Sequence, residues 1–292
     1  MNTLEKYLLA VDIGGSHISS CLININDFTV KNDGIITQKV NSFDNESIIL
    51  DCWTEHLAKQ LSKDVSKIAI AMPGPFNYQT ATALYNQGKK FGSLSNLPIG
   101  SILEKKLNAK VFFFNDADCF GIGEYKFGNG RSEGNMIGIT LGTGIGSTFI
   151  ESGKVITDSS DVPPDGEIFN LPFQEGIADD YFSTRWFVDF SSKQFGKQVN
   201  GVKSMIDQLD ELQLDITFTA FCDNFFIFMS PIMAKFNAKN LVLGGNISKA
   251  EKYLEPKLKA LFNNDVQIRF SELNETAILL GAAALAKTSI NS

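Results

Sequence analysis

The hydrophobic positions of the chain fall into short runs separated by polar turns, and several of these runs have the length of a β-strand. Residues 7–13 and 18–25 are two such runs, and Gly14 and Gly15 separate them. Short apolar runs bounded by glycine are typical of strands. The pattern therefore predicts that the chain begins with a strand, a glycine turn and a second strand.

The same order returns near the middle of the chain. Residues 135–141 are apolar, Gly142-Thr143-Gly144-Ile145-Gly146 forms a turn, and residues 147–150 resume the apolar pattern. A second strand–turn–strand unit is therefore predicted, so the chain consists of two halves that start in the same way. Further short runs predict strands at 68–72, 110–114, 155–156 and 241–243.

Other segments carry apolar residues at the spacing of three and four that one face of a helix requires. In residues 46–61, Ile49, Trp53 and Leu57 lie on one such stripe, and Asp116 is placed to cap a helix over 117–127. Residues 157–176 contain three prolines and two glycines and are predicted to be a loop. Further helices are predicted at 179–190, 202–212, 217–236 and 276–287.

Composition excludes several classes of protein. The chain has 292 residues, of which 43% are hydrophobic and 20% charged, so it is long enough for about two domains and too apolar to be disordered. Acidic residues outnumber basic ones by 33 to 26, which argues against binding nucleic acid or an anionic membrane through a basic surface.

Neither a membrane span nor a signal peptide is predicted. The most apolar long segment, 218–236, contains Asp223, Asn224 and Pro231, which favours a buried helix over a membrane span. The first residues lack a basic start followed by an apolar core, so a cytoplasmic location is expected.

The cysteines point to no metal or disulfide framework. The chain has four of them, they lie far apart, and no two are arranged as Cys-x-x-Cys. Neither a cysteine zinc cluster nor a redox pair is therefore predicted. The cysteine positions are Cys21, Cys52, Cys119 and Cys222.

Three glycine turns follow short strands and are the strongest chemical signal. Glycine lets backbone N–H groups approach an anion, and successive N–H groups form a nest that binds phosphate. None of the turns reads G-x-G-x-x-G, and the sequence has no Walker A loop, so neither of these nucleotide-binding motifs is present. We interpret the three turns together as a phosphate clamp between β-hairpins. Each turn taken alone could be an ordinary hairpin turn. The first turn comprises Gly14, Gly15 and Ser16, the second Gly142, Thr143 and Gly144, and the third Gly244, Gly245 and Asn246.

Asp12 ends its strand just before the first glycine turn. A carboxylate beside a phosphate site is repulsive unless a cation bridges the two, so Asp12 is expected to help hold Mg²⁺ directly or through water. The alternative is that Asp12 only caps the turn.

Four segments in this order together resemble the ROK family of repressors, open reading frames and sugar kinases, in the actin, sugar-kinase and heat-shock ATPase superfamily. These segments are 9–16, 115–118 (Asn115-Asp116-Ala117-Asp118), 140–146 and 241–247. The resemblance implies an α/β fold of two ribonuclease-H-like (actin-like ATPase) domains, 1–115 plus 276–292 and 116–275, flanking a cleft for ATP and a sugar. It also implies a homodimer and a last helix that returns to the N-terminal domain.

The resemblance carries over to the sugar site in part. It implies Asp116 as catalytic base, with Asn115, Gly74 and Glu167 at the sugar. Two residues after Glu167, however, the family's glycine and histidine are replaced by Phe169 and Asn170, so Asn170 stands at the histidine position.

Two further departures concern the same part of the family's pattern. Asp179 takes the place of a sugar-binding glutamate that is one methylene longer. The cysteines that bind a structural zinc in many members are missing, so no zinc is expected.

Asp116 suits the chemistry of phosphoryl transfer to a hydroxyl. A single aspartate can accept the hydroxyl proton as the phosphoryl group is transferred, and a helix N-terminus favours the ionised carboxylate. The sequence therefore predicts ATP-dependent phosphorylation of a hexose or N-acetylhexosamine with Mg²⁺. The alternative is a catalytically silent sugar- or nucleotide-binding sensor with the same fold.

Overall fold

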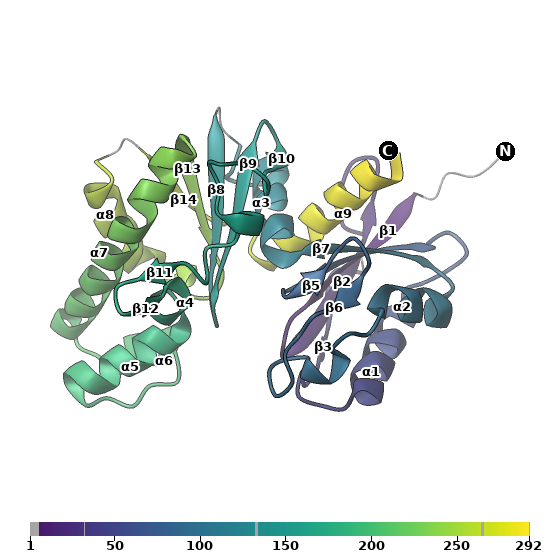
Figure 1. The fold of residues 1–292 in the computed structure, drawn as a ribbon, viewed down its shortest axis with the longest axis horizontal. Coiled ribbons are helices and arrows are strands. Elements are labelled where there is room, and N and C mark those ends of the chain that lie inside the picture. Colours follow the sequence, from purple (N-terminus) through teal and green to yellow (C-terminus); the bar gives the residue numbers. More distant parts are fainter. Residues whose placement is uncertain (1–5, 32, 132–133, 264–265, 292) are drawn as a thin grey trace. The chain divides into compact units, whose positions relative to one another are not determined.

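The chain forms two compact units in the computed structural model, which describes residues 6–31, 33–131, 134–263 and 266–291 (Figure 1). Unit 1 comprises Met1–Gly123 and Thr276–Ser292, and unit 2 comprises Glu124–Glu275. The division falls inside the helix that begins at Asp116, the residue where the sequence-based boundary was placed.

Unit 1 is built on a five-stranded sheet in the order β3-β2-β1-β4-β7. Strands β1, β2 and β3 form an antiparallel meander, whereas β4 and β7 run parallel to β1. The strands are β1 Tyr7–Ile13, β2 His17–Asn24, β3 Ile36–Lys39, β4 Lys67–Met72 and β7 Lys110–Asn115.

Unit 2 repeats this topology in a second five-stranded sheet, in the order β10-β9-β8-β13-β14. Its first three strands are again antiparallel, and β13 and β14 are parallel to β8. The α/β class with two ribonuclease-H-like domains is thus confirmed. The strands are β8 Asn135–Leu141, β9 Ile145–Glu151, β10 Lys154–Val155, β13 Ala238–Gly244 and β14 Gln267–Phe270.

The helices and the shorter elements connect these strands. Unit 1 contains α1 Glu46–Ala58 and α2 Ile99–Leu107, and unit 2 contains α4 Ala178–Tyr181, α5 Thr184–Phe195, α6 Val202–Gln208, α7 Glu211–Lys235 and α8 Glu251–Leu261; α3 Asp116–Phe127 and α9 Glu275–Asn291 contain the unit boundaries. The shorter elements are β5 Phe76–Asn77, β6 Thr82–Ala83, β11 Pro172–Phe173, β12 Gly176–Ile177 and the 3₁₀ turns η1 Gly92–Leu94, η2 Pro164–Gly166 and η3 Ser248–Ala250.

Two helix predictions need correction. The single helix predicted over 179–190 is in fact α4 and α5, because Ser183 has an extended backbone (φ −123°, ψ 166°) that interrupts the helical path. The break between the next two helices lies earlier than predicted, since Asp210 caps α7 and exchanges hydrogen bonds with Gln213 in a capping box.

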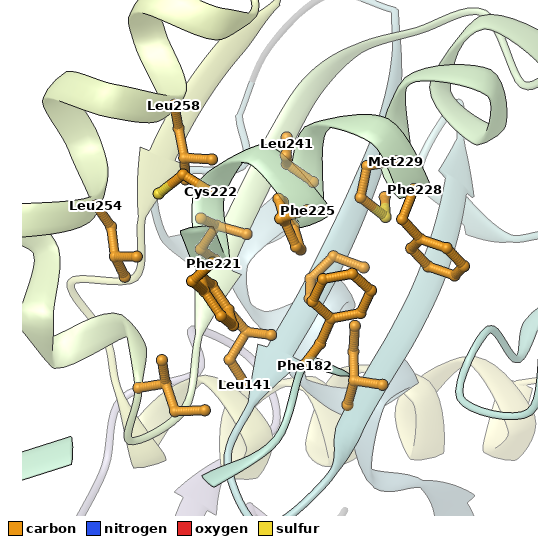
Figure 2. Packing of buried hydrophobic residues seen from close by; sticks show 14 of the residues in the cluster. Leu141, Phe182, Phe221, Cys222, Phe225, Phe228, Met229, Leu241, Leu254 and Leu258 are labelled. Atoms are coloured by element: carbon orange, nitrogen blue, oxygen red, sulfur yellow. The ribbon is translucent and has the colours of Figure 1, made fainter. Parts of the chain in front are cut away.

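The core of unit 2 is built around α7, whose phenylalanines pack against the sheet (Figure 2). Phe182 joins them from the break between α4 and α5, with ring centroids 5.6 Å from Phe225 and 5.1 Å from Phe228. Helix α7 is long and apolar enough to cross a membrane. Its buried stripe of Phe218, Phe221 and Phe225 is that of a core helix, as the sequence indicated.

In unit 1 the backbones of α3 and α9 touch where they cross. A Cβ on Gly123 would lie 1.9 Å from the carbonyl oxygen of Ala277, and a Cβ on Gly281 would lie 1.7 Å from that of Cys119. Glycine is therefore required at both crossings, because any side chain would push the helices apart. The C-terminal helix is in this way an integral part of unit 1.

Replacing Phe225 by alanine should destabilise the protein strongly, because its side chain is completely buried and the cavity cannot collapse between α7 and the sheet. We expect Phe225→Ala to lower the free energy of unfolding by about 3–5 kcal/mol, measured by urea denaturation followed by circular dichroism. Ile227→Ala is the control on the same helix, since Ile227 is 60% exposed. Equal losses in the two variants would contradict this description of the core.

Candidate functional site

The candidate catalytic residues of unit 1 gather at one edge of its sheet. Strands β1, β4 and β7 are parallel, with Asp12 opposite Ala71 and Met72 opposite Asn115. Carboxyl ends of parallel strands meet at the same edge, where open α/β sheets bind their ligands. Asp12, the loop with Gly74 after β4, and Asn115 with Asp116 after β7 are thereby brought to one edge, although the chain separates them widely.

The first glycine turn presents two backbone donors. The N–H of Gly14 donates to the carbonyl of His17 (2.9 Å), which closes the turn between β1 and β2. The N–H groups of Gly15 and Ser16 make no hydrogen bond to any residue that the structure describes. Two neighbouring N–H groups are thus available to an anion.

Asn115, and not Asp116, caps α3. The Oδ1 atom of Asn115 accepts hydrogen bonds from the backbone N–H groups of Ala117 (2.9 Å) and Asp118 (3.2 Å). An N-cap side chain must come from the residue before the helix, and α3 begins at Asp116, so the predicted cap was one residue too late. The Nδ2 group of Asn115 also donates to the hydroxyl of Tyr78 (3.2 Å), so this side chain is held rigidly.

Asp116 is placed at the first residue of α3, where its Oδ1 accepts from the N–H of Ala117 (2.9 Å). The side chain is only partly exposed, and burial raises the pKa of its carboxyl. The Ala117 N–H and the positive charge of Lys90 act in the opposite direction and favour the ionised form. The carboxylate is therefore held in one direction, and the pKa of Asp116 lies above its ordinary value, which makes this carboxylate a stronger base.

Other groups in unit 1 surround this carboxylate. Burial, and then the charges of Asp118, Asp116 and Asp12, raise the pKa of the Cys119 thiol, which indicates that Asp12 and Asp116 belong to one electrostatic neighbourhood. Burial and the charge of Asp116 raise the pKa of Tyr85.

Two tyrosines hold the loop that contains Gly74. Tyr85 donates its hydroxyl proton to the carbonyl of Pro73, and Tyr78 donates to that of Met72 (2.9 Å). Sequence reasoning identified neither these tyrosines nor Lys90, because no local pattern distinguishes them from other loop residues.

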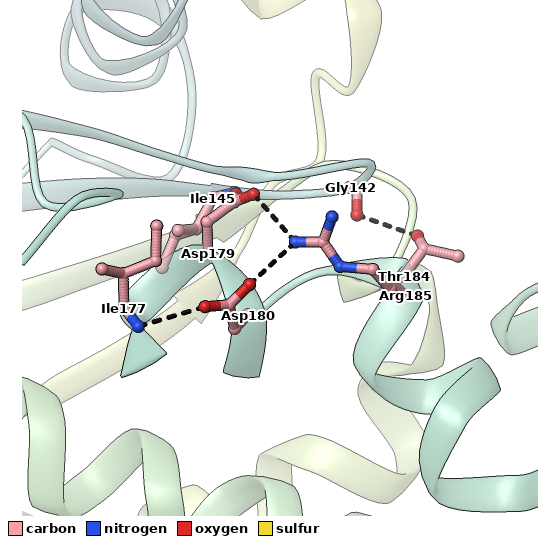
Figure 3. Close-up of polar contacts among 7 residues, drawn as sticks. All are labelled: Gly142, Ile145, Ile177, Asp179, Asp180, Thr184 and Arg185. Atoms are coloured by element: carbon pink, nitrogen blue, oxygen red, sulfur yellow. Dashed lines mark hydrogen bonds and ion pairs between the residues drawn. The ribbon is translucent and has the colours of Figure 1, made fainter. Parts of the chain in front are cut away.

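In unit 2 the second glycine turn is braced by Asp179 (Figure 3). Asp179 Oδ1 accepts from the N–H of Ile145 (3.0 Å), and its Oδ2 lies 3.4 Å from the guanidinium of Arg185. A Cβ on Gly144 would lie 2.5 Å from Asp179 Oδ1, so the carboxylate is packed directly on the turn. The sequence placed Asp179 at the sugar; in the structure both of its oxygens bind groups of unit 2.

The turn itself keeps two donors available. The carbonyl of Gly142 accepts from the N–H and the hydroxyl of Thr184, both at 2.8 Å, and the N–H of Gly142 donates to the carbonyl of Gly144 (3.0 Å). Within the described part of the chain, the N–H groups of Thr143 and Gly144 have no acceptor. The second glycine turn therefore has the same donor arrangement as the first.

The third glycine turn lies against the second. Gly245 has a φ of +86°, and a Cβ there would lie 2.4 Å from the carbonyl oxygen of Leu141, which also accepts from the N–H of Ile247 (3.0 Å). Only glycine satisfies both the positive φ and this approach. Because β8 and β13 are parallel, their glycine turns meet at one edge of the sheet.

Glu167 and Asn170 belong to the loop before α4. The hydroxyl of Ser147 donates to the carbonyl of Gly166 (2.7 Å) and accepts from the N–H of Ile168 (3.2 Å), which ties this loop to β9. Glu167 is partly exposed, and Asn170 is exposed. The N–H of Asp179 donates to the carbonyl of Phe169 (3.0 Å), so the three predicted sugar residues of unit 2 belong to adjoining segments.

The described residues contain no group of three or more His, Cys, Asp or Glu side chains that could hold a metal ion. A magnesium ion at Asp12 would therefore need phosphate oxygens and water as its other ligands, which is how Mg²⁺ is usually bound in nucleotide sites. The partly exposed carboxylate of Asp12, one residue from the first glycine turn, is compatible with such a site.

Residues 8–163 match the sequence profile of the ROK family, over more than half of the chain. This chain belongs to the ROK family. The match covers the first two glycine turns and the Asn115–Asp116 pair, and the family assignment from those motifs is confirmed.

Relatives of known name are similar over most of the chain. A glucokinase of Thermotoga maritima is 24% identical over 97% of this chain and 98% of its own length. An N-acetyl-D-glucosamine kinase of Haemophilus influenzae is 25% identical over 86% of this chain and 88% of its own. The crystal structure of a ROK family glucokinase from Streptomyces griseus in complex with glucose and AMPPNP has a TM-score of 0.75 at 22% identity, covering 97% and 99% of the two chains.

The contact between Gly144 and Asp179 predicts a sharp difference between two alanine substitutions in the same turn. Gly144→Ala should displace Asp179 from the N–H of Ile145 and lower the free energy of unfolding by about 1–3 kcal/mol. Gly142→Ala should leave stability nearly unchanged, because a Cβ there meets no atom within 4 Å. Thermal unfolding by differential scanning calorimetry measures both, and a Gly144→Ala variant as stable as wild type would show that Asp179 does not brace the turn.

Proposed function

We propose that the protein catalyses ATP-dependent phosphorylation of a hydroxyl of a hexose or N-acetylhexosamine. The observation that carries the proposal is the placement of a fixed, partly buried Asp116 at the same sheet edge as a glycine turn with two available N–H groups. The names of the relatives, glucokinase and N-acetyl-D-glucosamine kinase, support the class of acceptor.

Asp116 acts as the general base. The acceptor oxygen forms a bond to the terminal phosphorus as the bond from that phosphorus to ADP breaks, and the hydroxyl proton passes to the carboxylate of Asp116. Burial raises the pKa of this carboxyl, which makes it a stronger base than an ordinary aspartate, while the Ala117 N–H and the charge of Lys90 act in the opposite direction and favour the ionised form.

The N–H groups of the glycine turns stabilise negative charge on the nucleotide. In each of the first two turns the available N–H groups are fixed before an anion binds, so each turn can stabilise negative charge without reorganising. Asp12 would help to hold Mg²⁺, directly or through water, and the bound ion would supply further positive charge. An acidic chain can therefore bind ATP without a basic surface.

We propose the acceptor as a class, hexose or N-acetylhexosamine, because two of the family's sugar-binding positions are occupied differently in this chain. Asn170 stands at the position of the family's histidine, and both oxygens of Asp179 already bind groups of unit 2. Glu167, Asn115 and Gly74 keep the assignment to the sugar that the resemblance implies. A cytoplasmic location, where ATP is available, and a homodimer complete the proposal.

Removing the base is the direct test. Asp116→Asn should lower the rate of ADP release about 10²–10⁴-fold on whichever sugar of a hexose and N-acetylhexosamine panel the wild type uses, with little change in ATP affinity. Asp51→Asn is the control, because Asp51 is exposed and pairs with Lys106 on the surface. A coupled assay of ADP release measures the rates, and calorimetry measures ATP binding.

Two results would contradict the proposal. The wild type could release no ADP with any sugar of the panel while still binding sugar in calorimetry, which is the behaviour of a silent sensor. Alternatively, Asp116→Asn could turn over as fast as Asp51→Asn, which would show that another group takes the proton.

A further inference from the structure

A lysine that no sequence motif identified lies against the first glycine turn. Lys90 belongs to the segment between β6 and η1, and a Cβ on Gly15 would lie 3.1 Å from both Cδ and Cε of its side chain. The aliphatic part of Lys90 therefore lies close to the turn at Gly15. The residue itself is exposed, so its ammonium group can lie in solvent while its aliphatic part passes the turn.

The position of Lys90 is fixed by its neighbour. Phe91 is completely buried, and its ring lies 5.6 Å from that of Trp53 and 5.4 Å from that of Tyr85, measured between centroids. The backbone of Phe91 has a φ of +57°, a conformation that a bulky residue adopts only when its surroundings impose it. The core of unit 1 thus holds the backbone next to Lys90 in place.

A short chain of backbone hydrogen bonds links this anchor to the turn. The N–H of Phe91 donates to the carbonyl of Ser42 (2.8 Å), and the N–H of Ser42 donates to the carbonyl of Gly15 (3.2 Å). Ser42 is itself buried. The backbone next to Lys90 is therefore tied to the first glycine turn, which keeps the base of the Lys90 side chain beside that turn.

The charge of Lys90 also affects Asp116, the proposed catalytic base. Burial raises the pKa of Asp116, and the positive charge of Lys90 acts in the opposite direction. The other titratable groups of this neighbourhood are the carboxyls of Asp12 and Asp118, the Tyr85 phenol and the Cys119 thiol, and the last two are kept neutral by burial and by these negative charges. Lys90 is accordingly a cation that lies beside the first glycine turn and also acts on the pKa of Asp116.

We propose that Lys90 binds the terminal phosphoryl group of the nucleotide; this inference rests on the proposed kinase function. Charge on the transferred group is spread over its three outer oxygens in the transition state, and an ammonium beside them stabilises it. Lys90 neither gives nor takes a proton in this step: the hydroxyl proton goes to Asp116, and the electron pair of the breaking bond goes to ADP. No other residue of the turn supplies a positive side chain, since the first glycine turn is Gly14, Gly15 and Ser16.

The test compares a nucleotide that has the terminal phosphate with one that lacks it. In Lys90→Met, which keeps the length of the side chain and removes the charge, the Kd for AMPPNP with Mg²⁺ should rise about tenfold or more, and the Kd for ADP with Mg²⁺ should change less than about threefold. Isothermal titration calorimetry measures both. Lys89→Met is the matched control, because it removes the neighbouring positive charge and should leave both constants as in wild type.

Catalysis gives an independent readout. Loss of Lys90 removes the cation that lowers the pKa of Asp116, so the acidic limb of the kcat/KM profile should move to higher pH in Lys90→Met and return toward wild type in Lys90→Arg. A purely structural role for Lys90 would lower stability without moving this limb.

The outcomes separate the two proposals. Equal weakening of AMPPNP and ADP in Lys90→Met, or no weakening of either, overturns the role of Lys90 even if the wild type is an active kinase. If the wild type releases no ADP with any sugar, and Lys90→Met binds AMPPNP more weakly but ADP as tightly as the wild type does, the kinase function is overturned and the role of Lys90 as a phosphate ligand is supported. A wild type that binds neither nucleotide overturns both.

Discussion

The parallel course of β1, β4 and β7 is the constraint on which the chemistry of unit 1 depends. Asp12, Gly74 and Asn115 are far apart in the chain, and they share one sheet edge only because these strands run in the same direction. Side chains alternate between the faces of a strand, so a shift of register by one residue would turn Asp12 to the other face. The position of Asp116 is set by β7, the last of these strands, because α3 starts directly at the end of β7.

In unit 2, neighbouring groups hold the backbone of the glycine turns in place. A turn made of glycines has no side chains with which to hold itself, so neighbouring groups must do so. The carboxylate of Asp179 holds Ile145, the hydroxyl of Thr184 holds Gly142, and the carbonyl of Leu141 lies against Gly245. The result is a turn whose remaining N–H groups are fixed in direction, which is the condition for binding an anion at low cost in reorganisation.

The features that follow from local pattern could be predicted from the sequence, and those that depend on distant contacts could not. The strand–turn–strand units were predicted because apolar runs and glycines are adjacent in the chain. Helix α8 was not, because Pro256 breaks its helical pattern although the helix continues through it. The bond from Asp179 to Ile145 joins residues 34 positions apart, and the place of Lys90 depends on the burial of Phe91. No short motif records either contact.

The composition of unit 1 has a consequence for the order in which the protein acquires its structure during synthesis. Unit 1 combines residues that precede unit 2 with α9, which follows it, and α9 fits against α3 through Gly123 and Gly281 with no intervening side chains. Because α9 follows unit 2 in the chain, the ribosome makes all of unit 2 before it makes α9. Unit 1 therefore cannot acquire its complete structure until unit 2 has been synthesised, although domains generally fold in the order of their synthesis.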